Sequence, residues 1–141
     1  MTLPKKEASL VVPASQYYRR RGYRHQWREL QFFEYSIDLY VYNKNTDISI
    51  GIELKLKDWR RAITQAMLYS LCADMVMVCV PKLTARLVDV HILKECGIGL
   101  LSYEGRGLCR QLIVPKRSQM VRKDFRDHYV DFLLRPRNAR G

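Results

Sequence analysis

Six consecutive apolar residues, Met75 to Val80, constrain the fold of this chain more than any other feature. The run is short, contains three valines and ends at Pro81, which is typical of a β-strand that is buried on both faces. Strands of this kind occur mainly in parallel sheets that helices cover on both sides. The run therefore predicts an α/β fold.

The residues around this strand support the same fold class. Apolar residues from Trp59 to Leu71 recur with the period of a helix that has one buried stripe, and Asp58 before them is a suitable N-cap. Strands and helices alternate, so we expect a mixed sheet of four or five strands flanked by helices. The other predicted helices are 7–21 (kinked at Pro13 or starting near Ala14), 84–96 and 118–134, and the predicted strands are 23–30, 36–43, 48–56, 75–80 and 98–103.

Strands 36–43 and 48–56 are joined by turn-forming residues 44–47, which predicts a hairpin. With the turn centred between Asn45 and Thr46, the numbers of paired residues add up to 91, and Asp38 lies opposite Glu53. The same register predicts one wholly apolar face, made of Ile37 with Leu54, Leu39 with Ile52, and Val41 with Ile50.

The opposite face of the hairpin carries Ser36, Asp38, Glu53 and Lys55. Two carboxylates directly opposite each other have Cβ atoms about 5 Å apart and repel, unless a cation lies between them. Mg²⁺, with Mn²⁺ as a substitute, is typically held by one or two carboxylates, and it acidifies a bound water. Lys55 is placed to orient or deprotonate that water and to stabilise developing negative charge. The alternative is a solvated salt-bridge face of an ordinary amphipathic hairpin.

Positive charge is concentrated at the two ends of the chain. Residues 1–28 hold seven Lys and Arg against one acid, residues 29–114 hold ten of each sign, and residues 115–141 hold eight against three, which together give the formal net charge of +11. Two basic ends around a neutral middle predict a phosphate-rich partner, although a merely soluble basic surface gives the same distribution. The candidate nucleic-acid contacts are Arg19, Arg20, Arg21, Arg24, Lys116, Arg117, Arg122 and Lys123, and from the helix 59–71 also Arg61 and Tyr69.

Three short segments, Ile37-Asp38-Leu39, Ile52-Glu53-Leu54-Lys55 and Gln65 to Tyr69, resemble the PD-(D/E)xK nuclease superfamily, whose members include restriction enzymes and Holliday-junction resolvases. The resemblance spans roughly residues 7–103, and Ile37 stands where the family has proline. It implies a restriction-endonuclease-like core in residues 1–115, with the site on a hairpin at the edge of the sheet. Residues 116–141 are expected to form a basic C-terminal helix and tail packed on the same domain.

The same resemblance implies roles for single residues. Asp38 and Glu53 would bind Mg²⁺ and, with Lys55, activate water, while the carbonyl of Leu54 would be a further metal ligand. Gln65 would belong to the active site, as in RecB-like nucleases, and Glu7 is a possible fourth acid. Homodimers are common in this superfamily, so a homodimer that cuts both strands of DNA is expected.

Three functions compete at this point. The first is an Mg²⁺-dependent endonuclease acting on DNA, the second is a catalytically inactive nucleic-acid-binding module of the same fold, and the third is an interaction protein for acidic protein or RNA. The chain has no run of about 20 apolar residues and begins without a signal-like stretch, so we expect a cytoplasmic protein without a membrane partner. The four cysteines are isolated and are expected to be buried thiols, and Arg135, Arg137 and Arg140 are assigned to a flexible tail.

Overall fold

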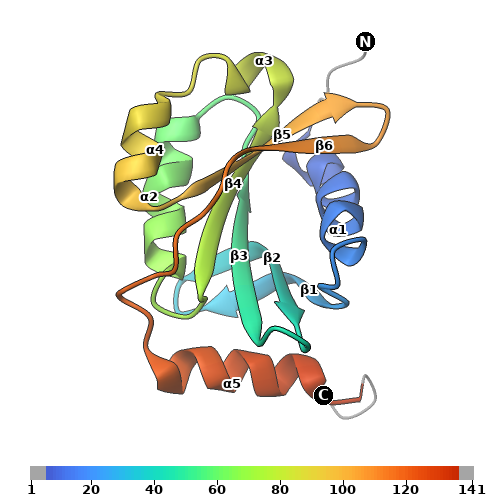
Figure 1. Cartoon of the computed structure of the whole chain (residues 1–141), viewed down its shortest axis with the longest axis vertical. Coiled ribbons are helices and arrows are strands. Elements are labelled where there is room, and N and C mark those ends of the chain that lie inside the picture. The colour runs from blue at the N-terminus through green and yellow to red at the C-terminus, as the bar shows by residue number, and fades with distance from the viewer. Residues whose placement is uncertain (1–5, 137–141) are drawn as a thin grey trace.

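Six strands form one mixed sheet, in which their order follows the chain (Figure 1). The structure is a computed structural model and describes residues 6–136. The first three strands pair antiparallel, β3 with β4 and β4 with β5 pair parallel, and β6 pairs antiparallel with β5. Their bounds are β1 His25–Phe32, β2 Tyr35–Asn43, β3 Ile48–Leu54, β4 Met75–Pro81, β5 Gly99–Gly105 and β6 Leu108–Ile113. The expected mixed α/β sheet is confirmed, with six strands instead of four or five.

Helices cover both faces of this sheet. A short 3₁₀ helix η1 (Glu7–Leu10) and α1 (Val11–Arg19) lie on one face, and α2 (Trp59–Tyr69), α4 (Val90–Cys96) and α5 (Lys123–Leu134) lie on the other, with α3 (Lys82–Ala85) directly after β4 (Figure 1). Pro13 lies in the first turn of α1, where a missing N–H costs nothing. The helix predicted for 84–96 is divided in two, because Asp89 caps a new helix by accepting hydrogen bonds from the N–H groups of His91 and Ile92.

The predicted register of the β2–β3 hairpin is confirmed, because Leu39 pairs with Ile52 and Val41 with Ile50. The predicted apolar face is wrong at one residue. Leu39 and Val41 pack in the core under α1, whereas Ile37 packs in the core on the α2 side. The strand thus switches face between Ile37 and Leu39, at Asp38.

A matching irregularity lies opposite Asp38 on β1. Glu29 has a φ of 52°, a left-handed value that is uncommon for a residue other than glycine, and the ladder skips the pair of Glu29 with Asp38. The hairpin is also not at an edge, since β1 lies outside β2 and the sheet continues beyond β3. The expectation of an edge hairpin is therefore wrong, and Asp38 belongs to the interior of the sheet.

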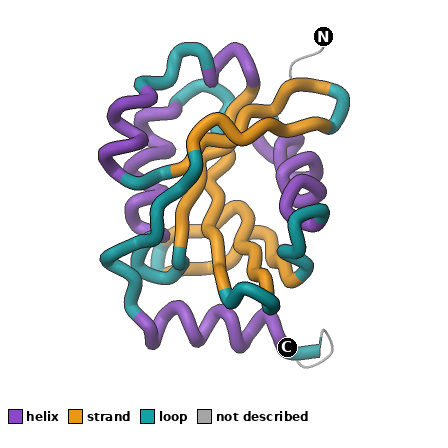
Figure 2. Tube along the Cα trace, viewed as in Figure 1, coloured by secondary structure: helices purple, strands orange, loops and turns teal. Residues whose placement is uncertain are grey.

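A long connection leads from β6 to α5 and crosses the sheet on the α2 side (Figure 2). Backbone hydrogen bonds fix it at three points, from Lys116 N to Gly97 O at 3.0 Å, from Ser118 N to Asp74 O at 2.8 Å and from Arg122 N to Leu71 O at 2.8 Å. The last helix consequently begins at Lys123 and not at 118.

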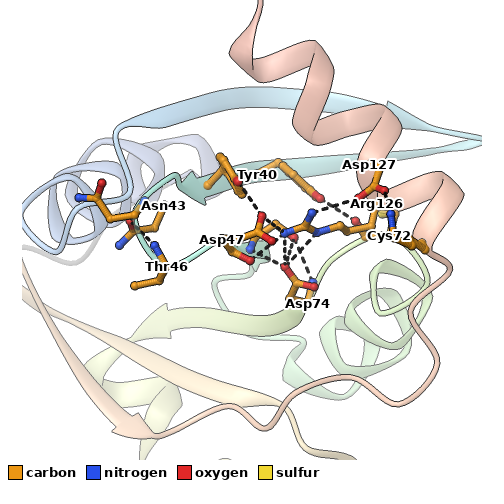
Figure 3. A network of polar contacts seen from close by, with 12 residues as sticks. Tyr40, Asn43, Thr46, Asp47, Cys72, Asp74, Arg126 and Asp127 are labelled. Carbon is orange, nitrogen blue, oxygen red and sulfur yellow. Dashed lines mark hydrogen bonds and ion pairs between the residues drawn. The ribbon is translucent and has the colours of Figure 1, made fainter.

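The C-terminal helix is tied to the sheet by a network around Arg126, whose side chain is 13% exposed (Figure 3). Its guanidinium contacts Asp47 at 2.6 Å, Asp74 at 3.1 Å and Asp127 at 3.0 Å. Asp74 also accepts hydrogen bonds from the backbone N–H and the hydroxyl of Ser49. The helix therefore packs on the same domain as the sheet, while Arg137 and Arg140 of the expected tail lie outside the described residues.

Candidate functional site

A pocket of about 510 Å³ opens where β2 and β3 part, between the start of α1 and α2. The last pair of the hairpin ladder is Leu39 with Ile52, and beyond it the carboxylate of Asp38 accepts a hydrogen bond from the N–H of Leu54 at 2.8 Å. The side chain of Asp38 thus replaces the neighbouring strand as the acceptor for β3. The pocket is lined by the predicted site residues Glu7, Asp38, Glu53, Leu54, Lys55 and Gln65, and by Ala8, Val11, Val12, Arg28, Glu29 and Ser36.

Glu53 lies at the floor of this pocket and is 2% exposed. Burial, a hydrogen bond with Asp38 and the negative charge of Asp38 raise the pKa of Glu53 to about 9, while Lys55 and Tyr69 act in the opposite direction. The carboxyl of Glu53 is therefore protonated at neutral pH and donates a hydrogen bond to Asp38. The predicted juxtaposition of two acids is present.

Tyr69 supports Glu53 from α2. Its side chain is fully buried, and its hydroxyl can donate either to Oε1 of Glu53 at 3.2 Å or to the carbonyl of Ser36 at 3.1 Å. Tyr69 was expected among the residues that contact nucleic acid, and this expectation is wrong because the side chain reaches no surface. Its position orients the carboxyl of Glu53 instead.

Lys55 and Glu7 form an ion pair across the mouth of the pocket, with Nζ and Oε2 3.8 Å apart. Their side chains are 20% and 45% exposed, so both remain accessible to a ligand. Glu7 reaches this place from η1, ahead of α1. Gln65 lines the pocket from α2, and its Oε1 is buried without a hydrogen-bond partner among the described residues. That oxygen is available to accept a hydrogen bond from water or from a ligand.

The residues present fit a hard divalent cation with an open coordination shell. Asp38 and Glu53 supply two carboxylates, Leu54 lines the same pocket, and a cation between the acids would relieve the repulsion that raises the pKa of Glu53. In residues 6–136, no group of three or more His, Cys, Asp and Glu side chains is close enough to hold a metal ion. Such a site would therefore depend on water and substrate for its remaining ligands, as Mg²⁺ sites commonly do.

Arg28 and Glu29 line the pocket from β1. Arg28 belongs to the basic cluster near the N-terminus that is a candidate for phosphate contacts, but neither residue is predicted as part of the active site. Both residues precede the hairpin in sequence. The left-handed backbone at Glu29 could not be predicted, because the residue with this conformation is not a glycine. Arg19, Arg20, Arg21 and Arg24 are exposed at the end of α1 and in the loop that follows. Arg19 donates to the carbonyl of Arg24, and the guanidinium of Arg21 lies 3.5 Å from the ring centre of Tyr17.

The basic residues of the C-terminal part lie elsewhere. Lys116 and Arg117 line a different pocket, of about 320 Å³, together with Glu95 and Gly97. Arg122 pairs with Asp124 at 3.3 Å and Lys123 with Asp127 at 2.5 Å, whereas Arg61 is exposed on α2. None of these five basic residues lines the pocket that holds Asp38 and Glu53.

Comparison with known proteins identifies a similar fold and no function. No protein-family model matches the chain, and no curated protein matches its sequence. A protein of unknown function from Silicibacter pomeroyi has a similar solved structure, with a TM-score of 0.70 and 15% sequence identity over 92% of this chain and 84% of that one. This likeness concerns the fold alone. In residues 6–136, no helix is long and apolar enough to cross a membrane.

Proposed function

We propose that this protein is a metal-dependent nuclease that hydrolyses phosphodiester bonds in DNA. The observation that carries the proposal is the placement of Asp38 and Glu53 in one pocket, with Lys55 at its mouth. A buried carboxyl whose pKa is raised by a neighbouring acid, as that of Glu53 is by Asp38, lowers the stability of the folded protein at neutral pH, and such groups are concentrated at functional sites. The restriction-endonuclease-like core and membership in the PD-(D/E)xK superfamily are part of this proposal.

Each residue of the pocket has a role in this reaction. Asp38, Glu53 and the carbonyl of Leu54 would hold Mg²⁺, or Mn²⁺ in its place, and Tyr69 keeps the carboxyl of Glu53 in position. When bound, the metal ion polarises the scissile phosphate and acidifies a water molecule. Lys55 stabilises the negative charge that develops on the phosphate.

Two further residues complete the proposed site. Gln65 accepts a hydrogen bond from the attacking water at its unpartnered Oε1, which directs the lone pair of that water toward phosphorus. Glu7 holds Lys55 through the ion pair until substrate enters. When the substrate enters, its phosphate displaces Glu7, and Lys55 then contacts the phosphate.

The test is incubation of the protein with plasmid, linear, single-stranded and branched DNA, in Mg²⁺ or in EDTA. We expect cleavage in Mg²⁺ alone and its loss in Asp38→Asn and Glu53→Gln. Glu95→Gln is the matched control, because Glu95 is 68% exposed on α4 and pairs only with His91 among the described residues. Absence of metal-dependent cleavage from every substrate would overturn the proposal.

A nucleic-acid-binding module without catalysis is the second candidate. The small number of possible metal ligands favours this candidate. In residues 6–136 no group of three or more such side chains occurs, and Asp38 and Glu53 are the two acids that contact each other in the pocket. Binding that is equal in wild type and Asp38→Ala, with no cleavage by either, would select this candidate.

The expected homodimer stays a prediction. Sedimentation of the protein with and without DNA tests it.

A further inference from the structure

A second pocket adjoins the candidate active site along α1. It has a volume of about 330 Å³ and is lined by Ser15, Arg19, Gln26, Trp27 and Arg28. Arg28 lines both pockets, so the two spaces are neighbours on either side of this residue. The first pocket reaches β1 at Arg28 and Glu29, and the second lies between α1 and β1. We name the space along these residues the α1–β1 groove, with residues 8, 11, 12, 15 and 19 of η1 and α1 on the helix side and 26–29 on the strand side.

The floor of the groove is held by Gln26. Its amide nitrogen donates to the carbonyl of Ser15 at 3.0 Å and to that of Tyr23 at 2.9 Å, and its amide oxygen accepts from the hydroxyl of Ser15. These bonds join the middle of α1 to the start of β1. The groove is therefore built before any ligand binds, which lowers the entropy cost of binding.

Charge changes along the groove. The acids Glu7, Glu29, Asp38 and Glu53 lie with Lys55 at one end, and Arg28 and Arg19 follow toward the other end, where no acid lines the second pocket. Arg28 is exposed and has no hydrogen bond or ion pair within residues 6–136, and Arg19 bonds only to the carbonyl of Arg24 there. Arg28 and Arg19 thus lie beside the proposed phosphodiesterase site and have no acidic partners. Guanidinium groups of this kind are suited to bind phosphates.

The helix side of the groove, across from Arg28, is apolar at the end that holds Asp38 and Glu53. Ala8, Val11 and Val12 form it, and Val12 is 48% exposed, although a valine on a helix surface contributes nothing to solubility. An apolar wall facing cations matches a nucleotide, which has a base or sugar on one side and a phosphate on the other. Free phosphate would use the cations and leave this wall unused.

The dimensions of the groove favour one strand over two. The pocket of about 330 Å³ equals a cube with an edge of roughly 7 Å and the pocket of about 510 Å³ one of roughly 8 Å, whereas the major groove of B-form DNA is by itself about 12 Å wide. From Ala8 to Arg19 the helix side is roughly 16 Å long, which corresponds to at most about five stacked nucleotides. A duplex is too wide to enter this space, and a single strand fits it.

We propose that the α1–β1 groove binds a single strand of DNA next to the scissile phosphate, with Arg28 and Arg19 as successive phosphate contacts. The inference rests on the proposed nuclease function, whose substrate it narrows to single-stranded DNA or a single-stranded segment of a larger DNA. Apolar contact with Val12 then takes the sugar or base of the strand.

The test is binding of a short, labelled oligothymidylate and of a duplex of equal length, followed by fluorescence anisotropy in EDTA over a range of salt concentrations. We expect the wild type to bind the single strand more tightly. Arg28→Gln and Arg19→Gln should each weaken binding roughly fivefold, and the double variant should reduce the slope of log K against log salt by about 1.4, or 0.7 per phosphate contact.

Two controls separate the groove from general charge. Lys94→Gln removes one positive charge from α4 on the other face of the sheet and should leave the affinity and the salt slope unchanged. Val12→Asp should weaken binding to the single strand, whereas Val114→Asp, at a residue that is 72% exposed in the β6–α5 connection, should not.

The outcomes distinguish this inference from the proposed function. Tighter binding of the duplex, or equal losses in Arg28→Gln and Lys94→Gln, would overturn the groove while Mg²⁺-dependent cleavage still supports the nuclease. Loss of single-strand binding in the arginine variants supports the groove whether or not cleavage is observed, because the assay contains no metal ion. A wild type that binds no DNA overturns the groove.

Discussion

Replacement of Glu53 by glutamine measures how much the pairing of Glu53 with Asp38 lowers the free energy of unfolding. The pKa of Glu53 is about 9 in the folded protein and 4.5 in an ordinary environment, so the folded state holds a proton that the unfolded state releases. The stability contributed by this proton is fully present below pH 4.5 and is lost as the pH rises toward 9. At pH 8 the loss amounts to as much as about 5 kcal/mol, at 1.4 kcal/mol for each pH unit above 4.5.

A glutamine at position 53 reproduces the protonated carboxyl at every pH. Its oxygen can accept from Tyr69 as Glu53 does, and its nitrogen can donate to Asp38. We therefore expect Glu53→Gln to be more stable than wild type at pH 8 in EDTA, by several kcal/mol, and by less than about 1 kcal/mol at pH 5. Other titrating groups are common to both proteins and cancel in the difference.

Urea denaturation of both proteins at pH 5 and pH 8 measures these free energies of unfolding. Saturating Mg²⁺ should stabilise the wild type at pH 8 and leave the variant unchanged, because only the wild type offers two carboxylates to the metal ion. A variant that gains less than about 1 kcal/mol over wild type at pH 8 in EDTA would refute the raised pKa of Glu53 as the origin of this loss of stability.

Three further changes test other parts of the structure. Tyr69→Phe removes the hydroxyl that positions the buried carboxyl, so calorimetric Mg²⁺ affinity and cleavage rate should each fall about 10- to 100-fold, and an unchanged affinity would contradict the positioning role. Arg126→Met leaves Asp74 buried without its cation and should lower the free energy of unfolding by about 3–5 kcal/mol, measured in urea, whereas Lys123→Met, at a side chain that is 90% exposed, should change it by less than about 1 kcal/mol. Arg106→Asn places a residue that tolerates left-handed backbone at a φ of 56° in the β5–β6 turn and should stabilise the protein by roughly 0.5–1 kcal/mol, so that a fall in the melting temperature would count against this reading of the turn.

The sequence contains enough information to predict which two acids meet at the centre of the candidate site. The hairpin register follows from one short turn, and a constant sum of residue numbers then places Asp38 beside Glu53 without any knowledge of the remaining fold. The buried strand β4 was equally readable, because all its apolar residues are consecutive.

The parts that were missed depend on tertiary structure. Most residues of β6 are exposed or half-buried, so the strand carries no strong apolar pattern. Strict alternation through Asp38 predicts the wrong face for Ile37, and the left-handed backbone at Glu29, opposite Asp38, has no local sequence signal. Tyr69 looked like a surface residue of a polar stripe, yet its hydroxyl finds partners inside the protein.

Because β2 changes face at Asp38, the position of the Asp38 carboxylate depends on the packing of both hydrophobic cores. Ile37 anchors β2 in the core beneath α2, and Leu39 anchors it in the core beneath α1, so the residue between them takes its direction from both. An engineer who repacks either core for thermal tolerance will rotate this short peptide segment and disturb the acid it carries. Redesign of the interior of this protein should therefore begin with Ile37 and Leu39 held fixed.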